Sequence, residues 1–195
     1  GEGIGFAIPV NKARAVVDAI LEQGRVTPSW LGILGQDMDP RAARALGLPR
    51  PEGLLVTECP VKGEMKPGDV LLTLNGQQVT DRAAYLSLLR NRQPGESIRA
   101  EVARRGKTIT LTLKTLPFSD KEAERLAERR WGVVPGKPAG LRGMGGLYIA
   151  SVKASSPAER LGLRSGDILI ALGGQRVSST DDYRDAFRRN YLSRQ

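Results

Sequence analysis

The stretch Lys66-Pro-Gly-Asp-Val-Leu-Leu-Thr-Leu-Asn-Gly-Gln-Gln-Val79 returns later in the chain as Arg164-Ser-Gly-Asp-Ile-Leu-Ile-Ala-Leu-Gly-Gly-Gln-Arg-Val177. Each copy has a Gly-Asp turn, a short run of mainly branched apolar residues, and a second turn that contains glycine. A polar start to an amphipathic helix follows in both copies. The repeat therefore predicts two similar modules, each with a strand that leads through a turn into a helix.

Further blocks repeat around this phrase in the same order. Their spacing differs between the copies while their order does not, so we expect the differences to lie in loops. This pattern indicates duplication of a domain rather than a solenoid of short repeats. The paired blocks are Trp30-Leu-Gly-Ile-Leu34 with Trp131-Gly-Val-Val134, Gly53-Leu-Leu-Val-Thr-Glu58 with Gly146-Leu-Tyr-Ile-Ala-Ser151, and the predicted helices 80–92 with 178–190.

The predicted organisation is α+β, with two small domains of somewhat under a hundred residues each. Module one spans residues 26–116 and closes with two alternating strands, 97–104 and 108–115. Module two spans residues 131–195 and lacks counterparts of these closing strands. We expect each module to form a small, partly open β-barrel or sandwich flanked by its helix.

Two further segments complete the chain. Residues 117–130 form a connector, in which Ser119-Asp-Lys-Glu122 matches the capping box of a short helix that runs to about Arg130. The high density of charge in this helix predicts a solvated spacer. In residues 1–25 we expect a strand at Gly1-Glu-Gly-Ile-Gly-Phe-Ala-Ile-Pro9, followed by a linker helix from Asn11 to about Gln23.

The composition argues against several kinds of chemistry. The chain of 195 residues has no histidine, which excludes His-based acid–base catalysis, Ser-His-Asp triads and the usual zinc sites. We therefore expect no catalytic residue, metal site or cofactor within it. The single cysteine, Cys59, cannot form an internal disulfide and is interpreted as a small, partly buried apolar residue. No apolar stretch is long enough to span a bilayer.

The net charge of +9 leaves two kinds of anionic partner open, a nucleic acid and a membrane surface. The arginines are scattered along the chain, and only 5% of its residues are aromatic, which leaves few platforms for stacking bases. A solvated basic surface that steers acidic or unfolded polypeptides is the preferred interpretation.

The repeated blocks resemble the PDZ domains of the bacterial HtrA/Deg family. The shared pattern is an apolar-Gly-apolar loop, a Gly-started strand, and the Pro-Gly-Asp phrase with its helix. The opening residues resemble the last strand of the trypsin-like protease domain in periplasmic serine endoproteases of the DegP/DegQ (Do) type, which would make this chain a fragment. Two departures stand out. The family's catalytic residues have no counterpart here, and only module two carries the Ser-Pro-Ala-x-x-x-Gly-Leu segment, at Ser156–Leu163.

This resemblance implies that each module binds an extended peptide, which adds as a strand between the module's opening strand and the helix after the repeated phrase. Gly32 and Gly132 are the candidates for a loop whose amides hold a terminal carboxylate. The candidate groove residues are Trp30, Leu31, Gly32, Ile33, Leu34, Tyr85, Leu86 and Leu89 in module one, and Trp131, Gly132, Val133, Val134, Tyr183, Arg184 and Phe187 in module two.

The resemblance also implies a biological setting. Module one would present unfolded segments or apolar C-termini to the protease domain of the same polypeptide, and module two would help to assemble a trimer-based homo-oligomer. The setting would be protein quality control and chaperone activity in the periplasm. The alternatives are an assembly module that binds no client, and a basic protein that binds nucleic acid or a membrane surface.

Overall fold

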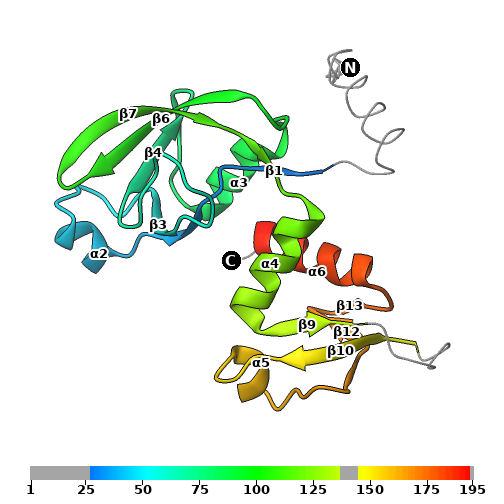
Figure 1. Cartoon of the computed structure of the whole chain (residues 1–195). Helices are drawn as coiled ribbons and strands as arrows, with labels where there is room; N and C mark the ends of the chain where they lie inside the picture. Colours follow the sequence, from blue (N-terminus) through cyan, green and yellow to red (C-terminus); the bar gives the residue numbers. More distant parts are fainter. Residues whose placement is uncertain (1–26, 137–144, 194–195) are drawn as a thin grey trace, which may run out of the picture.

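The computed structural model describes residues 27–136 and 145–193, drawn as coloured ribbon in Figure 1. The predicted strand and helix of residues 1–25 lie outside the described residues, as do residues 137–144 of the second module. Among the described residues, no helix combines the length and the apolar character needed to cross a membrane.

Module one is built on an antiparallel sheet with the strand order β2-β3-β4-β6-β7, in which β5 also pairs with β4. The predicted closing strands form its longest hairpin, and their register runs from Ser97 opposite Lys114 to Arg104 opposite Lys107. A separate short pair joins β1 to β8. The elements are β1 (Ser29–Trp30), β2 (Leu34–Asp37), α2 (Pro40–Ala45), β3 (Leu54–Glu58), β4 (Val70–Leu74), β5 (Gln77–Gln78), α3 (Arg82–Arg90), β6 (Ser97–Arg104), β7 (Lys107–Lys114) and β8 (Leu116–Pro117).

Module two has a smaller sheet with the order β11-β10-β9 and a separate hairpin of β12 with β13. Within the described residues, both modules therefore have open sheets rather than closed barrels, and the α+β prediction with two similar modules is confirmed. The remaining elements are α4 (Asp120–Trp131), β9 (Val133–Pro135), β10 (Leu147–Val152), α5 (Pro157–Arg160), β11 (Ile168–Leu169), β12 (Ala171–Leu172), β13 (Gln175–Arg176) and α6 (Thr180–Ser193).

The core of module one lies between its sheet and α3. Alternating apolar positions of β6, together with Leu71 and Leu74 of β4, share a core with the inner face of α3, where Tyr85 and Leu89 are buried. Cys59 packs against this core and is half-buried, as expected for a small apolar residue. Burial, with the nearby Asp69 carboxylate as a second cause, raises the pKa of its thiol above the usual value.

The connector forms the predicted helix, α4, which begins after Ser119, whose hydroxyl accepts from the Glu122 amide. The prediction of a solvated spacer is wrong. Ala123, Leu126 and Ala127 recur at helical spacing, and together they make a fully buried stripe against α6. The charged residues occupy the remaining face of α4. Because they outnumber the small apolar residues, the sequence did not indicate that one face of this helix is buried.

The stripe on α4 belongs to a core that both modules share. This core joins Trp30 and Leu34 from the entrance of module one, Phe118 from the connector, and Val133, Ile149 and Phe187 from module two. Figure 1 shows α4 and α6 side by side, between the sheets of the two modules. The two modules are therefore packed together through α4 and α6, and the segment between them is not a flexible linker.

Candidate functional site

The candidate groove of module one lies between β2 and α3. β2 is the end strand of the sheet, so no strand among the described residues pairs with its outer edge. The backbone amide of Arg82, at the start of α3, donates to the Asp37 carboxylate at the end of β2 over 2.7 Å. A sheet edge and a helix are thus fixed beside each other, as binding of an added strand requires.

The loop that enters β2 depends on Gly32. Its φ of 70° lies in the left-handed region, and a Cβ at this position would come within 2.9 Å of the Val61 Cβ. The Val61 amide donates to the Gly32 carbonyl over 3.4 Å, which ties the loop to the segment after β3. Glycine is therefore required here by both conformation and space, as the sequence suggested.

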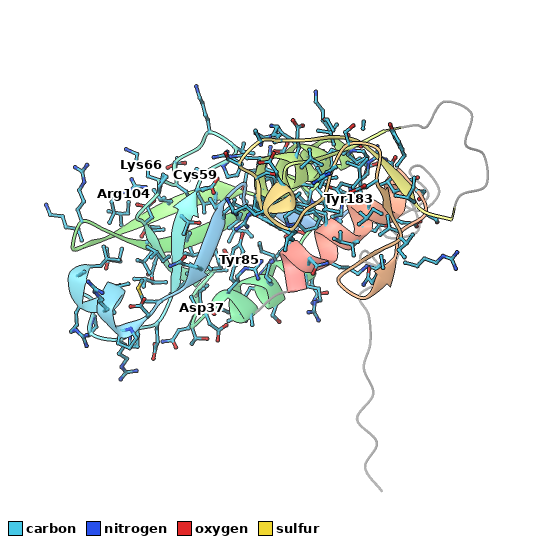
Figure 2. The ribbon with its side chains drawn as sticks, turned by 90° about the horizontal axis from the view of Figure 1, so that it is seen from below. Asp37, Cys59, Lys66, Tyr85, Arg104 and Tyr183 are labelled. Carbon is cyan, nitrogen blue, oxygen red and sulfur yellow. The ribbon has the colours of Figure 1, made fainter. Side chains whose placement is uncertain are left out.

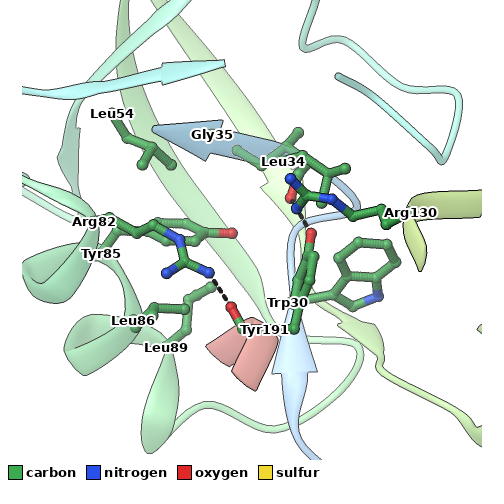
Figure 3. A pocket seen from close by; sticks show the side chains of 11 residues that line it. Trp30, Leu34, Gly35, Leu54, Arg82, Tyr85, Leu86, Leu89, Arg130 and Tyr191 are labelled. Atoms are coloured by element: carbon green, nitrogen blue, oxygen red, sulfur yellow. Dashed lines mark hydrogen bonds between the residues drawn. The ribbon is translucent and has the colours of Figure 1, made fainter. Parts of the chain in front are cut away.

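Most of the predicted groove residues of module one gather around one pocket. Ile33, Leu34, Tyr85, Leu86 and Leu89 line it from β2 and α3, as Figure 3 shows for the labelled residues. The Tyr85 phenol is deeply buried beside the Leu31 backbone, and this burial raises its pKa above the usual value. A phenol held neutral in this way presents an uncharged wall to any apolar guest.

Trp30 lines the same pocket but belongs mainly to the shared core. Its ring centroid lies 4.9 Å from that of Phe118 and 6.3 Å from that of Tyr191. Its side chain is almost completely buried. Trp30, predicted as a groove residue, therefore serves mainly as a packing residue at the entrance of module one.

One residue of the pocket comes from module two. Tyr191, in the last turn of α6, inserts between β2 and α3, and its hydroxyl donates to the Ile33 carbonyl over 3.3 Å. The Arg82 guanidinium donates to the Tyr191 backbone carbonyl. With this side chain in place, about 20 Å³ of free space remains, which is room for about one water molecule.

The groove positions of module two are arranged differently. Gly132 has a φ of 82° and ends α4, where its amide donates to the Glu128 carbonyl over 2.9 Å. A Cβ on Gly132 would meet the Ser156 side chain at 2.2 Å. Since its amide is used by the helix cap, Gly132 serves as a helix terminator here, whereas Gly32 serves as a turn before a free strand edge.

The helix of module two also turns its groove-side residues toward the connector. Arg184 Nε donates to the Glu124 carboxylate over 2.7 Å, and the Phe187 and Trp131 ring centroids lie 4.7 Å apart. Tyr183 is buried, and its hydroxyl donates to the Val133 carbonyl over 3.4 Å. Val134 is half-buried on β9, where it pairs with Ser151. The structure thus brings these predicted residues together, with α4 covering the helix.

Five residues that line the module-one pocket were not predicted from the sequence: Gly35, Leu54, Arg82, Arg130 and Tyr191. The signal for Tyr191 was present, because Tyr183, Phe187 and Tyr191 recur every four residues and form an aromatic stripe along α6. Phe187 and Tyr191 do stack, with ring centroids 5.6 Å apart. The predicted helix stopped at residue 190 and left out the last member of this stripe.

Comparison with known proteins agrees with this architecture. PDZ-domain family models match residues 32–115 and 148–190, which together make up more than half of the chain. The chain is 35% identical over 198 residues to the probable periplasmic serine endoprotease DegP-like of Ectopseudomonas mendocina (strain ymp), covering 91% of this chain and 42% of that protein. It is 30% identical over 188 residues to the periplasmic serine endoprotease DegP of Salmonella typhimurium, covering 93% and 39%.

Among solved structures, the HtrA-type protease AlgW with decapeptide is 33% identical over 60% of this chain and 37% of that chain, with a TM-score of 0.46. The chain spans about two fifths of the length of the curated relatives named above. On the sequence matches, this chain contains two PDZ domains and belongs to the PDZ-domain family, and the curated relatives that it resembles are periplasmic serine endoproteases of the DegP type.

Proposed function

We propose that module one binds extended peptides, or the C-terminal ends of unfolded proteins, as an added strand along the outer edge of β2. The observation that carries this proposal is the outer edge of β2, which no described strand pairs with and which faces α3 across an apolar pocket. Backbone hydrogen bonds to β2 would supply affinity, and the pocket lined by Ile33, Leu86 and Leu89 would select an apolar side chain. The loop turned by Gly32 is the proposed holder of a terminal carboxylate.

Magnitudes indicate weak binding at this site. Two apolar anchors contribute roughly 1.5 to 3 kcal/mol each, and a charge-assisted carboxylate contact contributes about 1.5 to 3 kcal/mol. Association and ordering cost at least about 4 kcal/mol. We therefore expect a Kd in the micromolar range or weaker, which suits a site that samples many clients.

The whole-protein role is proposed from the relatives. We propose that this region serves a periplasmic trypsin-like serine endoprotease and chaperone, to which module one presents clients. The proteolytic residues would then lie outside this chain, because the chain has no histidine for a triad and its family matches are PDZ domains.

A titration tests the binding proposal directly. A short fluorescent peptide ending in a free Phe carboxylate should bind saturably, and the same peptide with an amidated end should bind more weakly. Gly32→Val should abolish binding, because the larger side chain distorts the loop. Gly47→Ala is the matched control, since Gly47 also has a positive φ but no heavy atom lies near its Cβ direction. Equal binding by the Gly32 and Gly47 variants would contradict the proposal.

A second function, assembly through module two, is favoured by a separate observation. Ile170 and Leu161 of module two are exposed by 64% and 82%, and no strand among the described residues pairs with the outer edge of β11. Exposed apolar side chains beside an open edge favour contact with a second chain. Light scattering should then show concentration-dependent self-association without peptide, and Ile170→Lys should abolish it while Arg176→Lys should not.

Binding to nucleic acid or a membrane surface is not proposed. Arg104, Arg129, Arg184 and Arg188 each pair with a carboxylate of the chain, which lowers the free positive charge available to an anionic polymer. Binding of DNA or anionic vesicles that weakens steeply with salt would reopen these alternatives.

A further inference from the structure

We propose that Tyr191 of α6 is an internal competing ligand of the module-one groove, so that a guest peptide must displace the end of module two before it can bind. This inference rests on the proposed peptide-binding function and adds its regulation. The groove is thus occupied by part of the same chain, the last turn of α6.

The first support is the hydrogen bond between the Tyr191 hydroxyl and the Ile33 carbonyl, 3.3 Å long. Ile33 lies where the loop enters the edge strand β2, and a strand added there would offer backbone amides to carbonyls of this kind. The hydroxyl therefore occupies an acceptor that a guest would need. Figure 3 shows the Tyr191 ring beside Trp30, with its hydroxyl directed toward the start of β2 near Leu34.

The second support comes from the opposite wall of the groove. Arg82 donates from α3 to the Tyr191 carbonyl, near the end of α6, where helix carbonyls lack partners within the helix. A positive charge is favourable at this end of a helix dipole. Arg82 itself is fixed through its amide to Asp37 of β2. Both walls of the groove thus hold the same residue, one by its side chain and the other by its backbone.

The third support is the space that the ring fills. In the pocket between β2 and α3, about 20 Å³ remains free beside the ring, too little for a peptide side chain to enter that pocket while Tyr191 is in place. A wider cavity of about 520 Å³, which Tyr191 lines together with Gln36 and Arg130, lies next to it. The ring also stacks on Phe187 at 5.6 Å and packs on Phe118 at 5.2 Å, which places it in the groove before any guest arrives. An occupant that is tethered and already oriented lowers the apparent affinity of every guest.

Opening the groove needs only a local change. Tyr191 lies within the last turn of α6, which ends at Ser193, and terminal helical turns are among the least stable parts of a fold. The anchors of α6 on α4, such as the buried Arg188 that donates to the Asp120 carboxylate, lie before this turn. The tip can therefore unwind while the shared core stays packed.

Two variants of Tyr191 test the inference by peptide titration. Tyr191→Phe keeps the aromatic packing and removes only the hydroxyl, so the peptide ending in a free Phe carboxylate should bind about 2- to 10-fold more tightly than to the unchanged chain. Tyr191→Ala should tighten binding by at least about tenfold, because the groove loses its occupant. Tyr148→Phe is the matched control, since this half-buried tyrosine lies on β10, and it should leave the Kd unchanged.

The outcomes separate the two proposals. If all four proteins bind the peptide with the same Kd, the internal competition is overturned while the peptide-binding function stands. If none of them binds, the proposed function is overturned, together with the inference that rests on it. Should Tyr191→Ala unfold, which circular dichroism would reveal, the Tyr191→Phe result decides alone.

Hydrogen exchange on the unmodified chain gives a second test. Saturating peptide should speed amide exchange in the last turn of α6, because that turn is displaced, and should leave exchange in the middle of α4 unchanged. If the last turn exchanges no faster in the complex than in the free protein, the inference is wrong even where the peptide binds.

Discussion

The strand of the repeated motif, Lys66–Val79 in module one and Arg164–Val177 in module two, is buried in module one and half-exposed in module two. In β4, Val70 and Leu71 are almost completely buried, while their counterparts Ile168 and Leu169 are half-buried. The cause is the neighbouring strand, because β6 covers β4 over Val70 to Leu74, and no described strand covers the corresponding edge in module two. Local sequence therefore set the turn and strand in both copies, and the tertiary partner set how deeply they are buried.

The acidic residue of the phrase shows the same contrast. Asp69 is buried and forms a two-pronged pair with Arg104 of β6, with both donor–acceptor distances at 2.7 Å (Figure 2 labels Arg104). Asp167, its counterpart, is exposed and accepts from the Arg164 amide over 2.8 Å. Both carboxylates close the same turn, since Asp69 likewise accepts from the Lys66 amide. Among the residues that the structure describes, the ion pair is an addition found at Asp69 and not at Asp167.

The largest expected effect is on the stability of the repeated strand. Leu71→Ala should lower the free energy of unfolding by about 2 to 5 kcal/mol, because it leaves a cavity in a closed core. Leu169→Ala in module two should cost about 1 kcal/mol, since part of this side chain already faces solvent. Urea unfolding measures both. Equal losses would show that the two strands are buried to the same extent in solution.

The buried carboxylate gives the second test. Asp69→Asn should cost about 2 to 3 kcal/mol of unfolding free energy, because it leaves the Arg104 guanidinium without its charged partner. Asp167→Asn removes no buried charge pair and should cost about 0.5 kcal/mol or less. Thermal unfolding of the two variants compares them directly. A large loss for the Asp167 variant would mean that this carboxylate has a charged partner in solution.

The two loop glycines give the third test. Gly32→Ala and Gly132→Ala should each cost about 1 to 2 kcal/mol, because alanine fits poorly at φ of 70° and 82° and meets Val61 or Ser156. Only the first substitution should weaken peptide binding, since Gly132 ends a helix. Denaturant titration together with peptide titration separates the two roles. Equal weakening of peptide binding by both would contradict the assignment of Gly132.

The smallest effect is a pH dependence at the start of α6. The Ser178 hydroxyl and amide and the Ser179 amide donate to the Asp182 carboxylate and hold the pKa of this carboxyl at about 2, below its usual 3.8. Because the folded pKa is the lower one, the stabilisation is present above about pH 4 and is lost as the pH falls toward 2. Ser178→Ala should raise this pKa, as measured by carboxyl NMR shifts. An unchanged pKa would show that the backbone donors alone suffice.

The sequence predicted much of module one because its signals are local. The alternation in 97–104 and 108–115 predicted the β6–β7 hairpin with little error. The apolar residues of α3 were predicted as groove residues, and they line the pocket beside β2. These features depend on side-chain period and on backbone conformation within a few residues. Helix bounds were less accurate, since α6 runs on to Ser193.

The contacts between the modules could not be predicted in the same way. The α4 stripe of Ala123, Leu126 and Ala127 is short and lies among charged residues, so it gave a weak signal of burial. The pairing of Tyr191 with Ile33 joins residues far apart in the chain, and no local pattern encodes such a distance. For this reason, the sequence did not predict that α4 packs against α6 of module two.

The sequence by itself determined the duplication, the α+β class, the turn and strand of each phrase, and the need for glycine before β2. Those properties follow from the conformational preferences and spacing of neighbouring residues. Only the tertiary structure decided that α4 and α6 join the modules in one core, that Asp69 gains an arginine, and that Tyr191 lies in the groove of module one. These outcomes depend on which surfaces meet across the chain, and burial and charge pairing are set only when they do.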